Sequence, residues 1–253
     1  MPAPSTNPGR ELESRVALVT GSARNIGREI ALALARGGAS VVVHAKTSRA
    51  DAEATAAAVR AVGGKAAVVL ADLADPAGCK ALLDEAVAAF GRLDILVNNA
   101  ATRGDRSVPE ITVEDWRSVM SSILDGTFFC TQAALPYLKA SDAGAVVNIG
   151  GVAGETGVSG RAHVSAAKAG VMGLTRAMAA ELAADGITVN CVSPGRVETK
   201  RAHLPPHFAQ RQVPLGRGAE PWEIAAAVRF LAGPGARYIT GQVLPVNGGW
   251  HIA

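Results

Sequence analysis

The fold is decided by the stretch Val16-Ala17-Leu18-Val19-Thr20-Gly21-Ser22-Ala23-Arg24-Asn25-Ile26-Gly27. Its first five residues form an apolar run typical of a short buried strand, and the helical stretch Ile26–Arg36 follows. Gly21 allows a tight turn, and Gly27 allows the helix to approach the strand closely. The amide groups at a helix N-terminus attract phosphate. The stretch therefore predicts a strand–turn–helix unit that can hold a phosphate group.

Strand-like and helix-like segments alternate along the rest of the chain. The expected strands are Val16–Thr20, Ser40–Ala45, Ala66–Ala71, Leu93–Asn98, Ala145–Gly150, Thr188–Val192 and Gln242–Val246. The expected helices are Ile26–Arg36, Arg49–Val62, Pro76–Phe90, Val113–Leu138, Arg161–Ala184 and Glu220–Ala232. Strands that alternate with helices of this length form βαβ units with right-handed crossovers. We therefore expect an α/β fold: a doubly wound, seven-stranded parallel sheet of the Rossmann type.

The length of 253 residues fits one large domain. Met1–Glu11 is rich in Pro, Ser, Asn and Gly, so residues 1–12 are expected to form a flexible N-terminal tail. Residues 13–253 then make up the nucleotide-binding domain. Within it, Gly195–Leu215 contains three prolines and no clear periodicity, which is typical of a lid or binding loop near residues 195–215.

The composition argues against several classes of function. The formal net charge is only +3 and the basic residues are scattered among acids, so no nucleic-acid partner is expected. No apolar run approaches the length of a membrane span, and the N-terminus lacks the apolar core of a signal peptide, so we expect a cytoplasmic protein without a membrane partner. Cys79, Cys130 and Cys191 form no CxxC pair, and prolines break any helix between His203 and His207. Neither a disulfide framework nor a metal site is expected.

Four further features follow the later strands. They are Asp72-Leu73, Asn98-Asn99-Ala100, Lys168, and the segment from Pro194-Gly195 through Thr199. A doubly wound fold binds its ligand at the carboxyl ends of the strands. Together with the glycine-bracketed turn, these features resemble the short-chain dehydrogenase/reductase family. The resemblance runs from about Arg15 to the closing Val246-Asn247-Gly248-Gly249.

The resemblance implies a dinucleotide cofactor and assigns residues to each of its parts. The diphosphate would contact Thr20, Gly21, Asn25, Ile26 and Gly27; the adenine would contact Asp72 and Leu73; the ribose region would contact Asn98 and Ala100; the nicotinamide ribose would contact Lys168; and the nicotinamide end would contact Pro194, Gly195, Val197 and Thr199. Asn25 stands where the family usually has a glycine. Asparagine tolerates left-handed backbone better than most residues, so this departure is physically mild.

The choice between the two nicotinamide cofactors follows from charge. An enzyme that uses NAD typically places an acidic residue after the second strand to bind the ribose 2′-hydroxyl. This chain has His44-Ala45-Lys46-Thr47-Ser48 there, with no acid, and Arg24 lies in the phosphate turn. Two cations and two hydroxyls suit a 2′-phosphate, although exposed cations are also common on ordinary surfaces. We expect NADP(H) rather than NAD(H).

The catalytic positions implied by the resemblance depart from the family pattern. Lys168 is present, but the tyrosine position is Val164, the serine position is Gly151 and the asparagine position is Ile123. None of these three side chains can donate a proton or stabilise an oxyanion. A positioned acid contributes about 10²–10⁴-fold to such a reaction. Ordinary reduction of a ketone by the family's usual mechanism should therefore be badly impaired.

One substitute is considered for the missing acid, and three arginines are considered for substrate binding. His163, beside the vacant tyrosine position, could supply an acid near neutral pH, or it could pack on another face of its helix. Arg103, Arg161 and Arg196 lie on segments that border the family's substrate pocket, and they could bind a carboxylate, a phosphate or a CoA ester. The alternative for the arginines is an ordinary solvated surface.

Two functions follow. The first is an atypical NADP(H)-dependent oxidoreductase acting on a small molecule, neutral or anionic, with an activated C=C, an imine or a carbonyl. The second is a catalytically degenerate NADP(H)-binding pseudoenzyme that acts as a sensor, scaffold or partner subunit. The resemblance also implies that Val113–Leu138 and Arg161–Ala184 pair across a homo-oligomer, a tetramer or a dimer.

Overall fold

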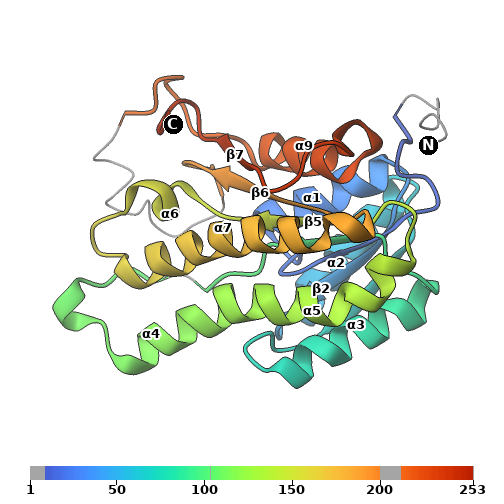
Figure 1. The fold of residues 1–253 in the computed structure, drawn as a ribbon, viewed down its shortest axis with the longest axis horizontal. Coiled ribbons are helices and arrows are strands. Elements are labelled where there is room, and N and C mark those ends of the chain that lie inside the picture. The colour runs from blue at the N-terminus through green and yellow to red at the C-terminus, as the bar shows by residue number, and fades with distance from the viewer. Residues whose placement is uncertain (1–8, 103, 200–211, 253) are drawn as a thin grey trace.

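The computed structural model describes residues 9–102, 104–199 and 212–252, and it contains a seven-stranded parallel sheet (Figure 1). The strand order is β3-β2-β1-β4-β5-β6-β7, and every paired register is parallel. The strands are β1 (Val16–Val19), β2 (Ser40–Ala45), β3 (Ala66–Leu70), β4 (Ile95–Asn98), β5 (Ala145–Ile149), β6 (Thr188–Pro194) and β7 (Val243–Val246). This order confirms the predicted doubly wound Rossmann-type sheet, and its switch point lies between β1 and β4.

Helices cover both faces of the sheet (Figure 1). The core on one face contains residues of α1 (Asn25–Arg36), α2 (Arg49–Ala61) and α9 (Pro221–Ala232). The core on the other face contains residues of α3 (Pro76–Phe90), α5 (Gly126–Ala140) and α7 (Ala162–Leu182). Successive side chains of a strand point to opposite faces, so both cores draw on the same strands. This double burial explains why the central strands are continuously apolar rather than alternating.

The long helical segment expected at Val113–Leu138 is interrupted. α4 (Val113–Met120) passes into a π-helical turn at Ser121–Asp125 before α5 begins. The sequence-based periodicity could not show this turn, because a single π turn changes the helical phase without changing the residue types. A short helix, α6 (Val152–Thr156), also follows β5 and is too short to show a period. Both features border the site described below.

The predicted flexible tail, residues 1–12, includes residues that are packed in the structure. Leu12 is only 2% exposed, and Glu11 forms an ion pair with Arg229 of α9, with Oε1 lying 2.7 Å from Nε. The packed chain therefore begins before residue 13, because Leu12 completes the apolar core beneath α1 and α9. Most of the predicted lid-like loop, including His203 and His207, lies outside the described residues. In the described ranges, no helix is long and apolar enough to cross a bilayer.

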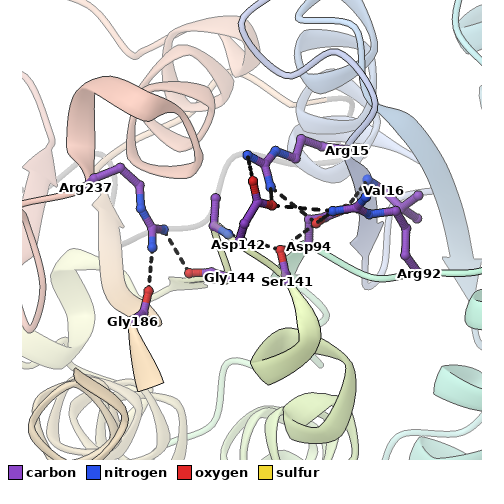
Figure 2. Close-up of polar contacts among 10 residues, drawn as sticks. Arg15, Val16, Arg92, Asp94, Ser141, Asp142, Gly144, Gly186 and Arg237 are labelled. Atoms are coloured by element: carbon purple, nitrogen blue, oxygen red, sulfur yellow. Dashed lines mark hydrogen bonds and ion pairs between the residues drawn. The ribbon is translucent and has the colours of Figure 1, made fainter. Parts of the chain in front are cut away.

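A buried carboxylate connects the amino-terminal ends of three central strands of the sheet (Figure 2). Asp94 is fully buried and accepts hydrogen bonds from Arg92 Nη2 at 2.6 Å, from the Val16 amide at 2.8 Å and from Ser141 Oγ at 2.5 Å. Arg15 lies 3.5 Å from the same carboxylate and pairs with Asp142. Burial acts to raise the pKa of Asp94, but these hydrogen bonds outweigh it and the pKa is lowered. Asp94 therefore ties the starts of β1 and β4 to the segment that precedes β5.

Candidate functional site

A cleft of about 610 Å³ opens along the carboxyl ends of the strands. It begins at the turn between β1 and α1, passes the ends of β2 and β3, and continues to Lys168 of α7 and Trp250. The predicted cofactor residues that line it are Gly21, Arg24, Asn25, Ile26, Gly27, Lys46, Thr47, Asp72, Leu73, Ala100, Lys168, Pro194, Gly195 and Val197. Residues that are distant in sequence therefore share one continuous cavity, large enough for a small-molecule ligand.

Three predicted cofactor residues do not line this cleft. Thr20 is buried, and its Oγ1 accepts hydrogen bonds from the amides of Asn99 at 2.9 Å and Ala100 at 3.0 Å. Asn98 is also buried, and its Nδ2 donates to Thr131 and Asn148. Thr20 and Asn98 thus hold the strand ends beneath the cleft, because their short side chains bond to neighbouring strands and helices. Thr199 lies outside the lining as well.

The turn between β1 and α1 leaves no space for side chains at its glycines. A Cβ atom on Gly27 would lie 2.4 Å from the carbonyl oxygen of Gly21 and 2.5 Å from Asn99 Nδ2. Asn25 has φ of +51°, the left-handed backbone that its residue type tolerates. Among the described residues, the N-cap Arg24 makes no side-chain capping bond to α1. The amides at the start of α1 therefore face the cleft without a side-chain cap, as an anion site requires.

His44 is a buried residue of the cleft to which the sequence analysis gave no role. It lies in β2 and is only 2% exposed. Its Nδ1 accepts a hydrogen bond from the Gly21 amide at 3.0 Å, and its Nε2 lies 3.0 Å from the carbonyl oxygen of Ala71. Burial lowers the pKa of this imidazole despite the hydrogen bond to Ala71 and the nearby charge of Asp72. The sequence signal that could have identified it is an imidazole directly after the three valines Val41–Val43 of the strand.

The cations expected at the adenine end are each close to a carboxylate. Lys46 Nζ lies 2.7 Å from Asp72 Oδ2, and Arg24 Nε lies 3.6 Å from Asp51 Oδ2. The hydrogen bond from Lys46 lowers the pKa of Asp72. All four side chains are substantially exposed, so these pairs are screened and contribute little to stability. Lys46 and Arg24 can therefore leave these carboxylates and bind a ligand phosphate at a small cost in free energy.

The four positions that the resemblance assigned to catalysis all line the inner part of the cleft. They are Ile123, Gly151, Val164 and Lys168. Ile123 and Val164 belong to a small apolar cluster between the π-helical turn and α7. Lys168 is 9% exposed, and its Nζ donates a hydrogen bond to the carbonyl oxygen of Ile149 at 2.6 Å. The ammonium group is thus oriented at the end of β5, beside side chains that cannot donate protons.

His163 is not placed where we expected a substitute acid. It is 1% exposed, does not line the cleft and lies beside Gly104, with its Nδ1 unpaired in the described part of the chain. The physical reason is helical geometry: each residue turns about 100°, so Val164 and Lys168, four residues apart, share a face that His163 does not. Of the two alternatives for His163, a substitute acid in the cleft is therefore wrong, and packing on another face of the helix is what the structure shows.

Two of the three arginines proposed for an anion are described, and they do not both face the cleft. Arg161 lines the cleft, and its Nε lies 2.9 Å from Asp105 Oδ1. Arg196 lies outside the lining, with Nη2 2.7 Å from Glu198 Oε1, because its side chain turns toward its own loop. Arg103 lies outside the described residues. Of the two described arginines, Arg161 stays a candidate for substrate binding, and the prediction for Arg103 is not tested.

Several residues that line the cleft, three serines and a tryptophan among them, were not predicted from the sequence. Ser118, Ser121 and Ser122 come from the end of α4 and the π-helical turn, and Ser122 Oγ accepts a hydrogen bond from the Thr102 amide at 3.3 Å. Trp250, near the end of the described chain, also lines this cavity. Nothing in their local sequence marks them, because they reach the cleft only through the packing of distant elements.

The fold and the site together define the class of protein. A doubly wound sheet, a glycine-bracketed turn and an inward-facing lysine after β5 are the features on which the sequence resemblance rested, and here they share one cleft. The chain belongs to the short-chain dehydrogenase/reductase family. The family model described as "Enoyl-(Acyl carrier protein) reductase" matches residues 21–251.

Particular relatives agree over nearly the whole chain. It is 42% identical to the 3-oxoacyl-[acyl-carrier-protein] reductase of Synechocystis over 240 residues, covering 94% of this chain and 97% of that protein. It is 40% identical to the 3-oxoacyl-[acyl-carrier-protein] reductase FabG of Staphylococcus aureus over 243 residues, covering 94% and 99%. A short-chain dehydrogenase of Burkholderia cenocepacia, solved in complex with NADP, is 34% identical with a TM-score of 0.90 and coverage of 94% and 98%. A mutant of a Serratia marcescens short-chain dehydrogenase/reductase is 36% identical, with a TM-score of 0.88 and the same coverage.

Proposed function

We propose that this protein is an NADP(H)-dependent oxidoreductase that works without the tyrosine acid of its family. Its substrate is a small molecule with a carbonyl, an activated C=C or an imine. The observation that carries the proposal is the continuous cleft from the Gly21–Gly27 turn to Lys168. A ligand bound along it would have its phosphates at the start of α1 and its reactive end beside Lys168.

The described residues fit such a cofactor. The close approach at Gly27 and the uncapped start of α1 suit a diphosphate, since both bring backbone amides within reach of it. Asp72 and Leu73 would hold the adenine, while Pro194, Gly195 and Val197 would hold the nicotinamide end. The complex of the Burkholderia cenocepacia relative with NADP supports the choice of cofactor.

The preference for NADPH over NADH depends on Lys46 and Arg24 in this proposal. Replacing Lys46 with alanine should weaken NADPH binding about tenfold, which corresponds to the loss of one charge-assisted hydrogen bond. NADH has no 2′-phosphate, so its affinity should stay unchanged. Isothermal titration calorimetry with both nucleotides measures the effect, and Lys65→Ala, a change of an exposed lysine that does not line the cleft, is the matched control. Equal losses for NADPH and NADH would contradict this role.

The reaction needs a proton as well as a hydride. NADPH, when bound, supplies the hydride. Of the four family positions, Lys168 alone carries a proton that it can donate, because Ile123, Gly151 and Val164 have no acidic group. We place Lys168 as the residue that protonates or polarises the substrate, with Ile149 holding its ammonium in position. Arg161 would bind an anionic group of the substrate at the cleft wall.

Oxidation of NADPH tests this activity. The panel should contain a 3-oxoacyl thioester, because of the named relatives, together with an enone and a cyclic imine. We expect turnover of at least one substrate class, and we expect Lys168→Ala to lower its rate about 10²-fold or more. The control is Lys139→Ala, which removes a lysine paired with Asp185 away from the cleft. An unchanged rate in Lys168→Ala would exclude Lys168 as the proton donor.

The second candidate function is a nucleotide-binding pseudoenzyme, and one observation favours it. Ile123, Gly151 and Val164 place apolar or absent side chains at the reaction end of an otherwise complete cofactor cleft. Such a site can bind NADPH and leave it unreacted. Tight NADPH binding without oxidation by any member of the panel would favour this sensor or scaffold role over the oxidoreductase.

A further inference from the structure

His44 joins the ends of three neighbouring strands beneath the cofactor cleft. Its ring receives the Gly21 amide from the turn after β1 and contacts the Ala71 carbonyl after β3, both at 3.0 Å. Its own backbone is tied to the same turn: the His44 amide donates to Ser22 Oγ at 3.0 Å, and the Ser22 amide donates to the His44 carbonyl at 2.9 Å. The ring and the backbone of one residue therefore both hold the glycine turn.

These contacts fix the protonation state of the ring. The Gly21 amide can only donate, so Nδ1 must be unprotonated and must accept. The Ala71 carbonyl can only accept, so Nε2 must carry the hydrogen and donate. The imidazole of His44 is therefore neutral, with its proton on Nε2. Protonation of Nδ1 would set two donors against each other at a buried position, and the Gly21 contact would be lost.

We propose that His44 is a positioning residue whose neutral ring holds the Gly21 turn in its cofactor-binding form, and that protonation of this ring weakens nucleotide binding in acid. The inference rests on the proposed cofactor function of the cleft. His44 does not need to touch the nucleotide, since it acts through the turn that does. Its role differs in this respect from the direct contacts of Lys46 and Arg24.

The charged groups around the His44 ring, together with its burial, decide the direction in which its pKa is shifted. The carboxylate that acts on His44 electrostatically is Asp72, from the segment after β3, and that carboxylate is already paired with Lys46 at 2.7 Å. The neighbours from the turn after β1, Gly21 and Ser22, are uncharged. Burial is thus the leading influence, and it lowers the pKa of His44. Because the proposal ties nucleotide binding to the neutral ring, binding releases any proton that His44 holds in the free protein, so the affinity rises with pH and falls in acid.

The test combines two variants with two nucleotides. His44→Asn retains an oxygen that can accept from the Gly21 amide but cannot titrate, whereas His44→Ala removes the acceptor. Affinity is measured by calorimetry from about pH 8 to about pH 5. The 2′-phosphate of NADPH itself titrates near pH 6, by about one proton, so NADH serves as the ligand without that group. Circular dichroism confirms that each variant is folded at each pH.

For the wild type, we expect the affinity for both nucleotides to fall about tenfold more in acid than for His44→Asn, since one buried ring becomes protonated. His44→Ala should bind about tenfold more weakly at neutral pH, the effect of one lost acceptor in a buried site. Nitrogen-15 NMR of the wild type without nucleotide should show His44 protonated on Nε2 and titrating below the ordinary value of about 6.5.

Equal pH dependence in the wild type and His44→Asn would overturn the inference, as would an Nδ1-protonated ring. The two proposals also separate cleanly. If neither nucleotide binds at any pH, the proposed function is wrong, and the NMR titration still decides whether His44 holds the turn as its neutral Nε2 form. If both nucleotides bind without a difference between wild type and His44→Asn, the cofactor function stands and the role of His44 is wrong.

Discussion

Replacing Asp94 with alanine is expected to lower the free energy of unfolding by about 3 kcal/mol, because a buried, multiply bonded carboxylate is lost. The variant leaves the buried Val16 amide without its side-chain acceptor and frees Arg92 and Ser141 from their shared partner (Figure 2). These contacts join segments that are far apart in sequence, so folding depends on all of them together. Chemical denaturation, monitored by circular dichroism, measures the change.

Asp142→Ala is the matched control for Asp94. It removes a carboxylate of the same network, but one that is largely exposed and paired mainly with Arg15. Its effect should be much smaller than that of Asp94→Ala. Similar losses in the two variants would show that the network acts through general surface charge rather than through the buried carboxylate.

The contribution of Asp94 should also depend on pH. The pKa of Asp94 in the folded protein is lowered, so its stabilisation is fully present above the unfolded value of about 3.9. As pH falls from there through the lower folded pKa, the carboxylate becomes protonated and the stabilisation is lost. The difference in unfolding free energy between the wild type and Asp94→Asn should therefore shrink below pH 4, by an amount that grows with acidity.

Restoring the three vacant family positions should create reduction of simple carbonyls. In the combined variant Ile123→Asn, Gly151→Ser and Val164→Tyr, the new hydroxyl of residue 164 would lie on the same helix face as Lys168, four residues on. We expect the rate of 3-oxoacyl thioester reduction to rise by about 10²–10⁴-fold over the parent, the contribution of a positioned acid. Single-turnover oxidation of NADPH measures it without interference from product release.

The local geometry leaves space at two of these positions, although the backbone at Gly151 strains any side chain. A Cβ atom on Gly151 would have the Pro194 carbonyl oxygen as its nearest neighbour, at 3.9 Å, although the φ of +155° lies at the edge of the range that favours glycine. Val164 lines the cleft, so a larger side chain can extend into it. The control variant carries Phe instead of Tyr at residue 164 and fills the same space without a hydroxyl. Equal rates in the Tyr and Phe variants would show that the missing acid is not what limits the parent.

Much of the fold was accessible from short-range patterns. The strand at Val16–Val19 is an apolar run, and the approach of α1 to it needs a residue without Cβ at Gly27. Asn25 has the left-handed backbone for which asparagine was judged suitable. These properties depend on a few neighbouring residues, so the sequence was sufficient to predict them. The clustering of Ile123, Gly151, Val164 and Lys168 followed from the family resemblance rather than from periodicity.

Other features depended on contacts that local sequence does not contain. The π-helical turn at Ser121–Asp125 shifts the phase of a helical region, so a period of 3.6 residues carries no sign of it. The sequence left open whether His163 faces the cleft or another side of its helix, and only the packed helix decides that it faces away. Lys46 and Arg24 were predicted to bind a 2′-phosphate, and the ion pairs that they form with Asp72 and Asp51 could not be read from the sequence.

The sequence by itself determined the parallel α/β sheet, the glycine-bracketed turn after the first strand, and the residue types Ile123, Gly151 and Val164 that the proposed function rests on. Each of these is set by residue type and spacing, which are local properties. Only the tertiary structure decided that His44 supports the Gly21 turn and that Asp94 binds the Val16 amide. The reason is that these partners lie 23 and 78 residues apart, and their hydrogen bonds exist only after the sheet has brought its strand ends together.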